Sequence, residues 1–346
     1  MTVSLYDMSC LFLASVIIAL GGCILFTNGI EWLGKRLKVP EGAIGSIFAG
    51  VGTALPETTI PVIAIFFGTG QEQTDIGLGA ILGAPFMLST LALPILAGLL
   101  VFCAKMGKRK SAFVLNYQEV RIDLLFFLIA YGLALACIFV SIPAIRYGVA
   151  ALLILLYLVY MKLKFSSEQQ DSSVLAPLIL ARRSTVPSYA MIGRQVAIGL
   201  IGLVGGAHLF ITAVKSLSAE LAVSPLLLAL LITPLVTELP EMLNGFLWLY
   251  RRKDTLAVGN VTGAMVFQGT LPVSVGLIGT SWNLTPSALA TMGLAIAAVA
   301  LSFSQLLGGG HWRPWLLGAN ALLYIGFFTL YISVPCLKSA VLYCPP

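Results

Sequence analysis

The sequence predicts an all-α integral membrane protein with ten transmembrane helices, arranged as two inverted five-helix repeats. Three observations support this fold class. The chain of 346 residues is 59% hydrophobic and only 10% charged, whereas soluble domains carry about 25% charged residues. Its apolar residues form ten runs, and the length of each is close to or above the ~20 residues that a helix needs to cross a bilayer. A short motif that ends in a carboxylate occurs once in each half of the chain.

The ten apolar runs divide the chain into two halves of five. In order they cover residues 10–33, 41–67, 75–103, 119–140, 143–163, 191–216, 223–250, 255–280, 287–307 and 313–334. A stretch rich in Ser, Gln and Arg separates the fifth run from the sixth. We therefore expect a first five-helix repeat at 1–165, a cytoplasmic linker at 166–190 and a second repeat at 191–346.

The positions of Lys and Arg predict the orientation. The expected loops after the odd-numbered spans, with the helix ends beside them, hold 17 of the 20 basic residues; the other three are Arg146, Lys215 and Lys338. Both termini are therefore expected outside, and the membrane is expected to be the plasma (inner) membrane. Because five is an odd number of spans, the second repeat enters from the opposite face, so the repeats are inverted.

The repeated motif places two glutamates inside apolar runs. Residues 53–57 read Thr-Ala-Leu-Pro-Glu, and residues 237–241 read Thr-Glu-Leu-Pro-Glu. A carboxylate within a bilayer is costly and indicates a functional site, while proline removes a backbone donor and weakens the helix. Paired Pro-interrupted segments in two halves indicate a transporter binding site. Glu57 and Glu241 are therefore candidate ligands for a hard cation, which prefers oxygen.

A second set of matches follows each motif at an offset of 180 residues. Gly79 and Gly83 correspond to Gly259 and Gly263, and Thr90 corresponds to Thr270. The two motif regions thus extend over residues 50–90 and 233–272.

These regions resemble the two α-repeats of the cation/calcium exchanger superfamily, which includes the sodium/calcium exchangers, and the chain is identified as a divergent member. The resemblance implies a core of spans 2, 3, 7 and 8 that holds the ions, with spans 1 and 6 sliding across it. It also implies that Glu57 and Glu241 coordinate the ion, while Thr53 and Thr237 offer hydroxyl and backbone oxygens. The implied function is secondary antiport of Ca²⁺ or a related cation against Na⁺ or H⁺, with no cofactor besides the transported ions.

The chain departs from the family pattern in a way that shifts the expected site toward spans 7 and 8. The late polar position of span 3 is Leu88, whereas the second half has Asn260 and, at the late position of span 8, Gln268. Glu238 stands where the family usually has a serine, three residues before Glu241. Two carboxylates this close in a low-dielectric site should not both stay ionised without a cation. Glu238, Asn260 and Gln268 are therefore further candidate ligands, and Glu238 predicts proton coupling, with sodium coupling as the alternative.

Other functions stay open at this point. A degenerate family member would bind cations without transport, and a passive cation channel would need no counter-ion. Asn260 and Gln268 could instead join helices by hydrogen bonds. An enzyme is not expected, because the two histidines, His208 and His311, form no catalytic or metal-binding motif. Inorganic cations and the lipid bilayer are the expected partners. The basic excess is explained by the loops and requires no nucleic acid, and the sequence indicates no oligomeric state.

Several single residues also carry expectations. Cys23, Cys137 and His208 are expected to pack as core residues. Trp282 and Trp312 fall at expected span ends, where tryptophan commonly anchors a helix at the membrane interface.

The topology can be tested by cysteine labelling in a background that lacks the six native cysteines. Single cysteines at position 70 and in the loop around position 282 should react with an impermeant reagent applied to intact cells, whereas those at 108 and 252 should react only after the membrane is opened. Labelling of position 108 from outside would overturn the orientation.

Overall fold

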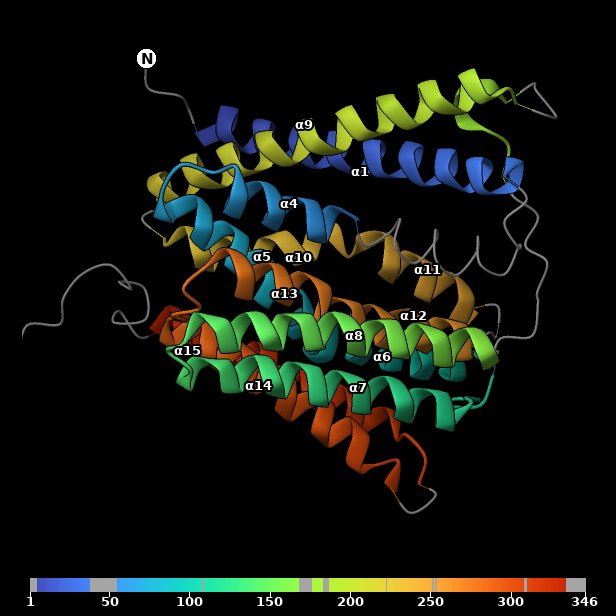
Figure 1. Ribbon diagram of the computed structural model, residues 1–346. Coiled ribbons are helices and arrows are strands. Elements are labelled where there is room, and N and C mark those ends of the chain that lie inside the picture. The colour runs from blue at the N-terminus through green and yellow to red at the C-terminus, as the bar shows by residue number, and fades with distance from the viewer. Residues whose placement is uncertain are drawn as a thin grey trace, which may run out of the picture.

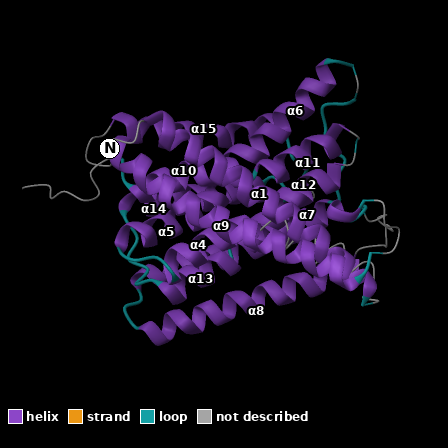
Figure 2. Ribbon diagram, turned by 90° about the horizontal axis from the view of Figure 1, so that it is seen from above, coloured by secondary structure: helices purple, strands orange, loops and turns teal. Residues whose placement is uncertain are grey.

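The structure is a computed structural model that describes residues 5–37, 55–107, 109–167, 176–182, 187–221, 223–250, 252, 254–307 and 310–333. All regular elements in these ranges are helices (Figure 2). In order they are α1 (Leu5–Arg36), α4 (Leu55–Phe66), α5 (Gln71–Met87), η2 (Leu88–Ala92), α6 (Leu93–Lys105), α7 (Tyr117–Ala136), η3 (Cys137–Phe139), α8 (Pro143–Ser167), η4 (Ile179–Ala181), α9 (Tyr189–Leu221), α10 (Pro225–Thr237), α11 (Leu239–Tyr250), α12 (Asp254–Gln268), α13 (Leu271–Gly279), α14 (Pro286–Ser304) and α15 (Pro314–Ser333).

Many of these helices are apolar and long enough to cross a membrane, as an integral membrane protein requires. In the described part, seven segments meet this condition: Met8–Arg36, Gln71–Lys105, Tyr117–Phe139, Pro143–Lys164, Tyr189–Leu221, Ala257–Gly279 and Pro286–Ser304. Shorter apolar helices cover Glu57–Phe66, Pro225–Leu235 and Pro314–Leu330. The expected span at 223–250 is two helices, α10 and α11, and only the second part of the expected span at 41–67 belongs to the described residues.

The helices form three layers (Figure 1). The long helices α1 and α9 lie together on one side, and α7, α8, α14 and α15 lie on the other. Between them lie the short and interrupted helices, including α4, α5 and α10 to α13. The described elements that carry predicted ligands therefore belong to the middle layer.

Glycines let α1 and α9 pack backbone against backbone. A Cβ atom on Gly22 of α1 would lie 2.3 Å from the amide nitrogen of Leu203. A Cβ atom on Gly206 of α9 would lie 2.5 Å from the amide nitrogen of Ala19. Small residues at such crossings allow close helix approach in membranes, so α1 and α9 form one tightly packed pair.

The Gly-x-x-x-Gly motif of α5 has the same role against α10. A Cβ atom on Gly79 would lie 2.3 Å from the carbonyl oxygen of Leu226, and one on Gly83 would lie 2.1 Å from that of Leu230. Both contacts are with backbone atoms, which a side-chain rotation cannot relieve. The motif thus holds α10, which leads to Glu238, directly against α5.

The described part of the chain between the two halves is bound to the α1–α9 pair. The side-chain oxygen of Asn28 accepts hydrogen bonds from the amide of Ile179 at 3.1 Å and from Gln195 Nε2 at 2.9 Å. The side-chain oxygen of Gln195 accepts from the amide of Leu180 at 2.8 Å. Asn28 lies on α1 and Gln195 on α9, so residues 176–182 are fastened to both helices at once.

Three single-residue expectations were wrong and two are confirmed. Trp282 and Trp312 are not interface anchors: they are 1% and 3% exposed, and each indole donates to a main-chain carbonyl within the bundle. His208 is not a core residue, because α9 presents it at the surface. Cys23 and Cys137 are buried, as predicted.

Replacing Gly83 with alanine should destabilise the protein by about 1–3 kcal/mol, as overpacking does in well-packed cores. The control is Gly98→Ala on α6, where no described atom lies within 4 Å of the added Cβ. Alanine there should be neutral or stabilising, by up to ~1 kcal/mol from helix propensity. Thermal unfolding in detergent measures both, and equal melting temperatures for the two variants would contradict the packing role.

Candidate functional site

A break between α10 and α11 places a carboxylate inside the protein. Pro240 has no amide hydrogen and so cannot donate to the carbonyl of Val236 one turn earlier. Helix α10 ends at Thr237 and α11 begins at Leu239, with Glu238 between them. Glu238 is 0% exposed. The proline of the motif therefore creates the bend that holds this carboxylate in the middle layer.

Gln268 meets Glu238 at the end of α12. It is the last residue of that helix, is 2% exposed, and its Nε2 donates a hydrogen bond to Glu238 Oε1. The other polar atom of the amide, Gln268 Oε1, is buried and has no hydrogen-bond partner among the described residues. A carboxylate beside an available amide carbonyl is an oxygen-ligand pair that suits a hard cation.

Two threonines of α10 lie on one face of that helix. Thr237 is 5% exposed, and its hydroxyl donates to the carbonyl of Thr233 at 3.1 Å, which leaves its oxygen lone pairs available. Thr233 is 1% exposed, and its hydroxyl has no hydrogen-bond partner among the described residues. Thr233 was not predicted from the sequence, although its i, i+4 spacing from Thr237 was a signal that both face the same way.

The other predicted ligands lie on other helices than the Glu238–Gln268 pair, at another height along α12, or outside the described residues. Glu57 is 3% exposed on α4, which packs against α5, α9 and α13. Asn260 is half-buried on α12, eight residues before Gln268 and thus about 12 Å from it along the helix axis. Thr53 and the side chain of Glu241 lie outside the described residues. Of the predicted ligands, the described contacts join Glu238 and Gln268 directly.

The first half has an interruption at the position that corresponds to the end of α12. The π-helix η2 begins at Leu88, the counterpart of Gln268 at the offset of 180. The hydroxyl of Thr90 donates to the carbonyl of Phe86, and the hydroxyl of Thr270 donates to that of Val266 at 2.7 Å. These two hydrogen bonds occupy equivalent positions. Leu88 is fully buried and apolar, whereas its counterpart Gln268 is buried and polar.

Acidic and metal-binding side chains do not cluster in the described part of the chain. No three His, Cys, Asp or Glu side chains there lie close enough together to hold a metal ion. The candidate ligands in the part that the structure describes are single carboxylates, amide oxygens and hydroxyl oxygens.

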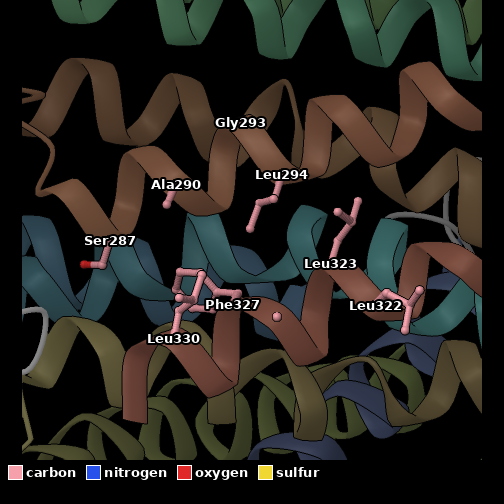
Figure 3. A pocket seen from close by; sticks show the side chains of 9 residues that line it. Ser287, Ala290, Gly293, Leu294, Leu322, Leu323, Phe327 and Leu330 are labelled. Atoms are coloured by element: carbon pink, nitrogen blue, oxygen red, sulfur yellow. The ribbon is translucent and has the colours of Figure 1, made fainter. Parts of the chain in front are cut away.

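A groove between α14 and α15 is unsuited to ions. It has a volume of about 530 Å³, and Figure 3 shows that apolar side chains such as Leu294, Leu323 and Phe327 line it. Ser287 is the one lining residue with a polar side chain. Such a lining suits hydrocarbon and offers too few oxygen ligands for a cation.

A second buried carboxylate supports α12 from its other side. Asp123 of α7 is 0% exposed and lies 2.8 Å from Lys164 Nζ of α8. Its Oδ1 also accepts from the hydroxyl of Tyr160 at 3.0 Å, and its Oδ2 accepts from the hydroxyl of Thr262 at 2.6 Å. Thr262 lies on α12, so this cluster fixes the helix that carries Gln268. Asp123 was not predicted from the sequence, although a carboxylate inside an apolar span was the signal for it.

Comparisons with known proteins agree with this architecture. The family model described as sodium/calcium exchanger protein matches residues 8–165 and 195–334. The uncharacterized membrane protein MJ0091 of Methanocaldococcus jannaschii is 22% identical over 264 residues, which are 74% of this chain and 76% of that protein.

Solved structures share the fold. The H⁺/Ca²⁺ exchanger CAX matches with a TM-score of 0.72 at 15% identity, over 95% of this chain and 82% of that one. YfkE matches with a TM-score of 0.64 at 16% identity, over 94% and 92%. The sodium-calcium exchanger NCX_Mj matches with a TM-score of 0.53 at 19% identity, over 93% and 98%.

The Asp123 cluster can be tested by a double-mutant cycle. Asp123→Asn should lower the free energy of unfolding by about 1.5–3 kcal/mol, the range for hydrogen bonds to charged groups. Adding Lys164→Met should recover part of this loss, because it removes the cation left without its partner. Lys162→Met, on an exposed position of the same helix, serves as the control. Thermal unfolding of the two single variants and the double variant measures the cycle. If the stability loss of the double variant equals the sum of the two single losses, the coupling between Asp123 and Lys164 is refuted.

Proposed function

Because this chain belongs to the sodium/calcium exchanger family, we propose that it is a secondary cation antiporter that exchanges Ca²⁺ or a related cation against Na⁺ or H⁺ by alternating access. The observation that carries the proposal is the buried Glu238–Gln268 pair at the break between α10 and α11. H⁺/Ca²⁺ and sodium-calcium exchangers are among the proteins that share the fold.

The pair can bind a cation and orient it. The ionised carboxylate of Glu238 offsets the hydration that a cation loses in a low-dielectric interior. Gln268 Oε1 offers a second oxygen, and the lone pairs of Thr237 a third. We assign further ligand positions to the motif residues Glu57, Glu241 and Thr53. Asn260 lies about 12 Å from Gln268 along α12, so we assign it to a second ion position on the same helix.

The same pair favours proton coupling. Gln268 donates to Glu238 Oε1, and that oxygen can accept the hydrogen bond whether the carboxyl group is ionised or protonated. The amide therefore holds the carboxyl group in place while it gains or loses a proton. A proton on Glu238 neutralises the buried carboxylate in the empty site and leaves when a cation binds.

We further propose ten transmembrane helices in two inverted repeats, 1–165 and 191–346, joined by residues 166–190. The equivalent hydrogen bonds of Thr90 and Thr270 support the repeat. The close packing of α1 against α9 supports their movement as one unit across the middle layer. The proposed location is the plasma (inner) membrane with both termini outside, and no cofactor besides the transported ions is required.

Flux in proteoliposomes tests the function. Wild-type protein should accumulate Ca²⁺ when a pH gradient is imposed at fixed Na⁺. Glu57→Gln should reduce this flux at least ~30-fold, which corresponds to the loss of about 2 kcal/mol from a charged ligand. Glu238→Gln should keep the acceptor for Gln268 yet abolish the response to the pH gradient, because an amide does not titrate. Glu220→Gln, on an exposed position of α9, should behave as wild type.

Other results would contradict the proposal in distinct ways. Ca²⁺ movement without any counter-ion would indicate a passive channel. Melting that depends on Ca²⁺, together with no flux, would indicate a binding protein that does not transport. Uptake that follows a Na⁺ gradient, ignores pH and survives Glu238→Gln would reject proton coupling while leaving antiport intact.

A further inference from the structure

We propose that a cavity where α6 and α11 end binds the phosphate headgroup of an anionic phospholipid. The cavity has a volume of about 330 Å³ and is lined by Cys103, Gly107, Arg109, Tyr250 and Arg252. It lies far along the bundle from the extracellular loops that the topology predicts, at the end that α6, α11 and α12 share (Figure 1, right).

One ion pair brings the two walls of the cavity together. Arg109 donates to both carboxylate oxygens of Asp254, one of them at 2.8 Å, and to the carbonyl of Leu249 at 3.1 Å. Asp254 also accepts from the amide of Val114 at 2.9 Å. The loop after α6 and the loop before α12 are thereby joined. The Arg109 side chain is only 8% exposed, and its Nε–H has no acceptor among the described residues.

The sequence around the cavity carries a large excess of positive charge. Residues 105–110 and 251–253 contain seven Lys and Arg residues, and Asp254 is the one acidic residue directly beside them in the chain. The one carboxylate, Asp254, pairs with Arg109, so the chain on both sides of the cavity is strongly basic in sequence. Basic pockets between transmembrane helices attract anionic headgroups in this way.

The backbone of Arg252 points to a ligand independently of the charge. Its φ is +60°, in the left-handed region that glycine adopts freely and other residues adopt seldom. Its amide donates to the carbonyl of Leu249 at 3.1 Å, so this residue closes the end of α11. Glycine is the usual residue at such a helix end. An arginine there keeps a guanidinium at the cavity in spite of backbone strain, and strained residues cluster at ligand sites.

The position of the cavity favours a lipid over a soluble anion. The apolar segment Gln71–Lys105 ends beside it, and the segment Ala257–Gly279 begins one turn beyond it. Tyr250, which lines it, is 60% exposed at the end of α11. Tyrosine and arginine at the ends of apolar helices lie at the level of lipid headgroups. A phosphate at this level arrives on a phospholipid that is already in the membrane.

The test compares lipid binding by three full-length proteins in neutral detergent, with native mass spectrometry and thermal unfolding as readouts. Wild type should bind phosphatidylglycerol, gain thermal stability from it, and prefer it to phosphatidylcholine. Arg252→Gly removes the guanidinium and relieves the strain, so it should fold at least as stably without lipid while binding phosphatidylglycerol about fivefold more weakly. Lys110→Gln removes the same charge from an exposed position of the loop outside the cavity and should bind as wild type.

Three outcomes would overturn the inference. Equal binding of phosphatidylglycerol and phosphatidylcholine would reject recognition of the anionic headgroup. If Arg252→Gly and Lys110→Gln weaken phosphatidylglycerol binding equally, the lipid is attracted by the charge of the loops in general and not bound at a specific site. Stabilisation by inorganic phosphate, lost in Arg252→Gly, without a matching effect of phosphatidylglycerol would assign the cavity to a soluble anion. Because none of these readouts measures flux, they are independent of the proposed antiport.

Discussion

The structure depends on the need to give every polar group in the hydrocarbon layer a partner within the protein. An unbroken helix satisfies its own backbone, but the middle layer is interrupted, and each interruption releases carbonyls or amides. Hydroxyl groups meet part of this need, as when Thr90 and Thr270 donate to carbonyls one turn earlier. Glu238 and Gln268 meet another part by pairing with each other. Polar side chains therefore gather where helices break, and a site for a polar cargo forms there as a consequence.

The helix α12 is held from two directions, which gives the candidate site a rigid support. Thr262 is bound to Asp123 on one side, and Gln268 reaches Glu238 on the other. Asp123 belongs to α7 and Glu238 to the break between α10 and α11, so α12 cannot rotate without breaking a buried hydrogen bond to a carboxyl group. A binding site with ligands from several elements requires such support, because small displacements of an oxygen weaken its coordination. The cluster around Asp123 thus bears on the site although it contributes no ligand.

The sequence was sufficient for the helical class, the location of most spans and the break at Glu238, because apolar length and proline chemistry are local properties. It also identified the difference between Leu88 and Gln268 at equivalent positions, and both side chains are buried. It could not predict the bond between Glu238 and Gln268, which depends on where two helices 30 residues apart end. It also misplaced Trp282 and His208. An apolar helix presents similar residues to lipid and to protein, so hydropathy alone does not say which face is buried.

The pairing of α1 with α9 has a consequence for how the protein is made. The contact between Gly22 and Leu203 joins residues about 180 positions apart in the chain. A ribosome adds ~5–20 residues per second, so α1 waits on the order of ten seconds or more in the bilayer before α9 is synthesised. During that interval its glycine face has no protein partner, and Asn28 exposes an amide to lipid. Biogenesis thus requires that lipids or the insertion machinery shield this face until the second half arrives.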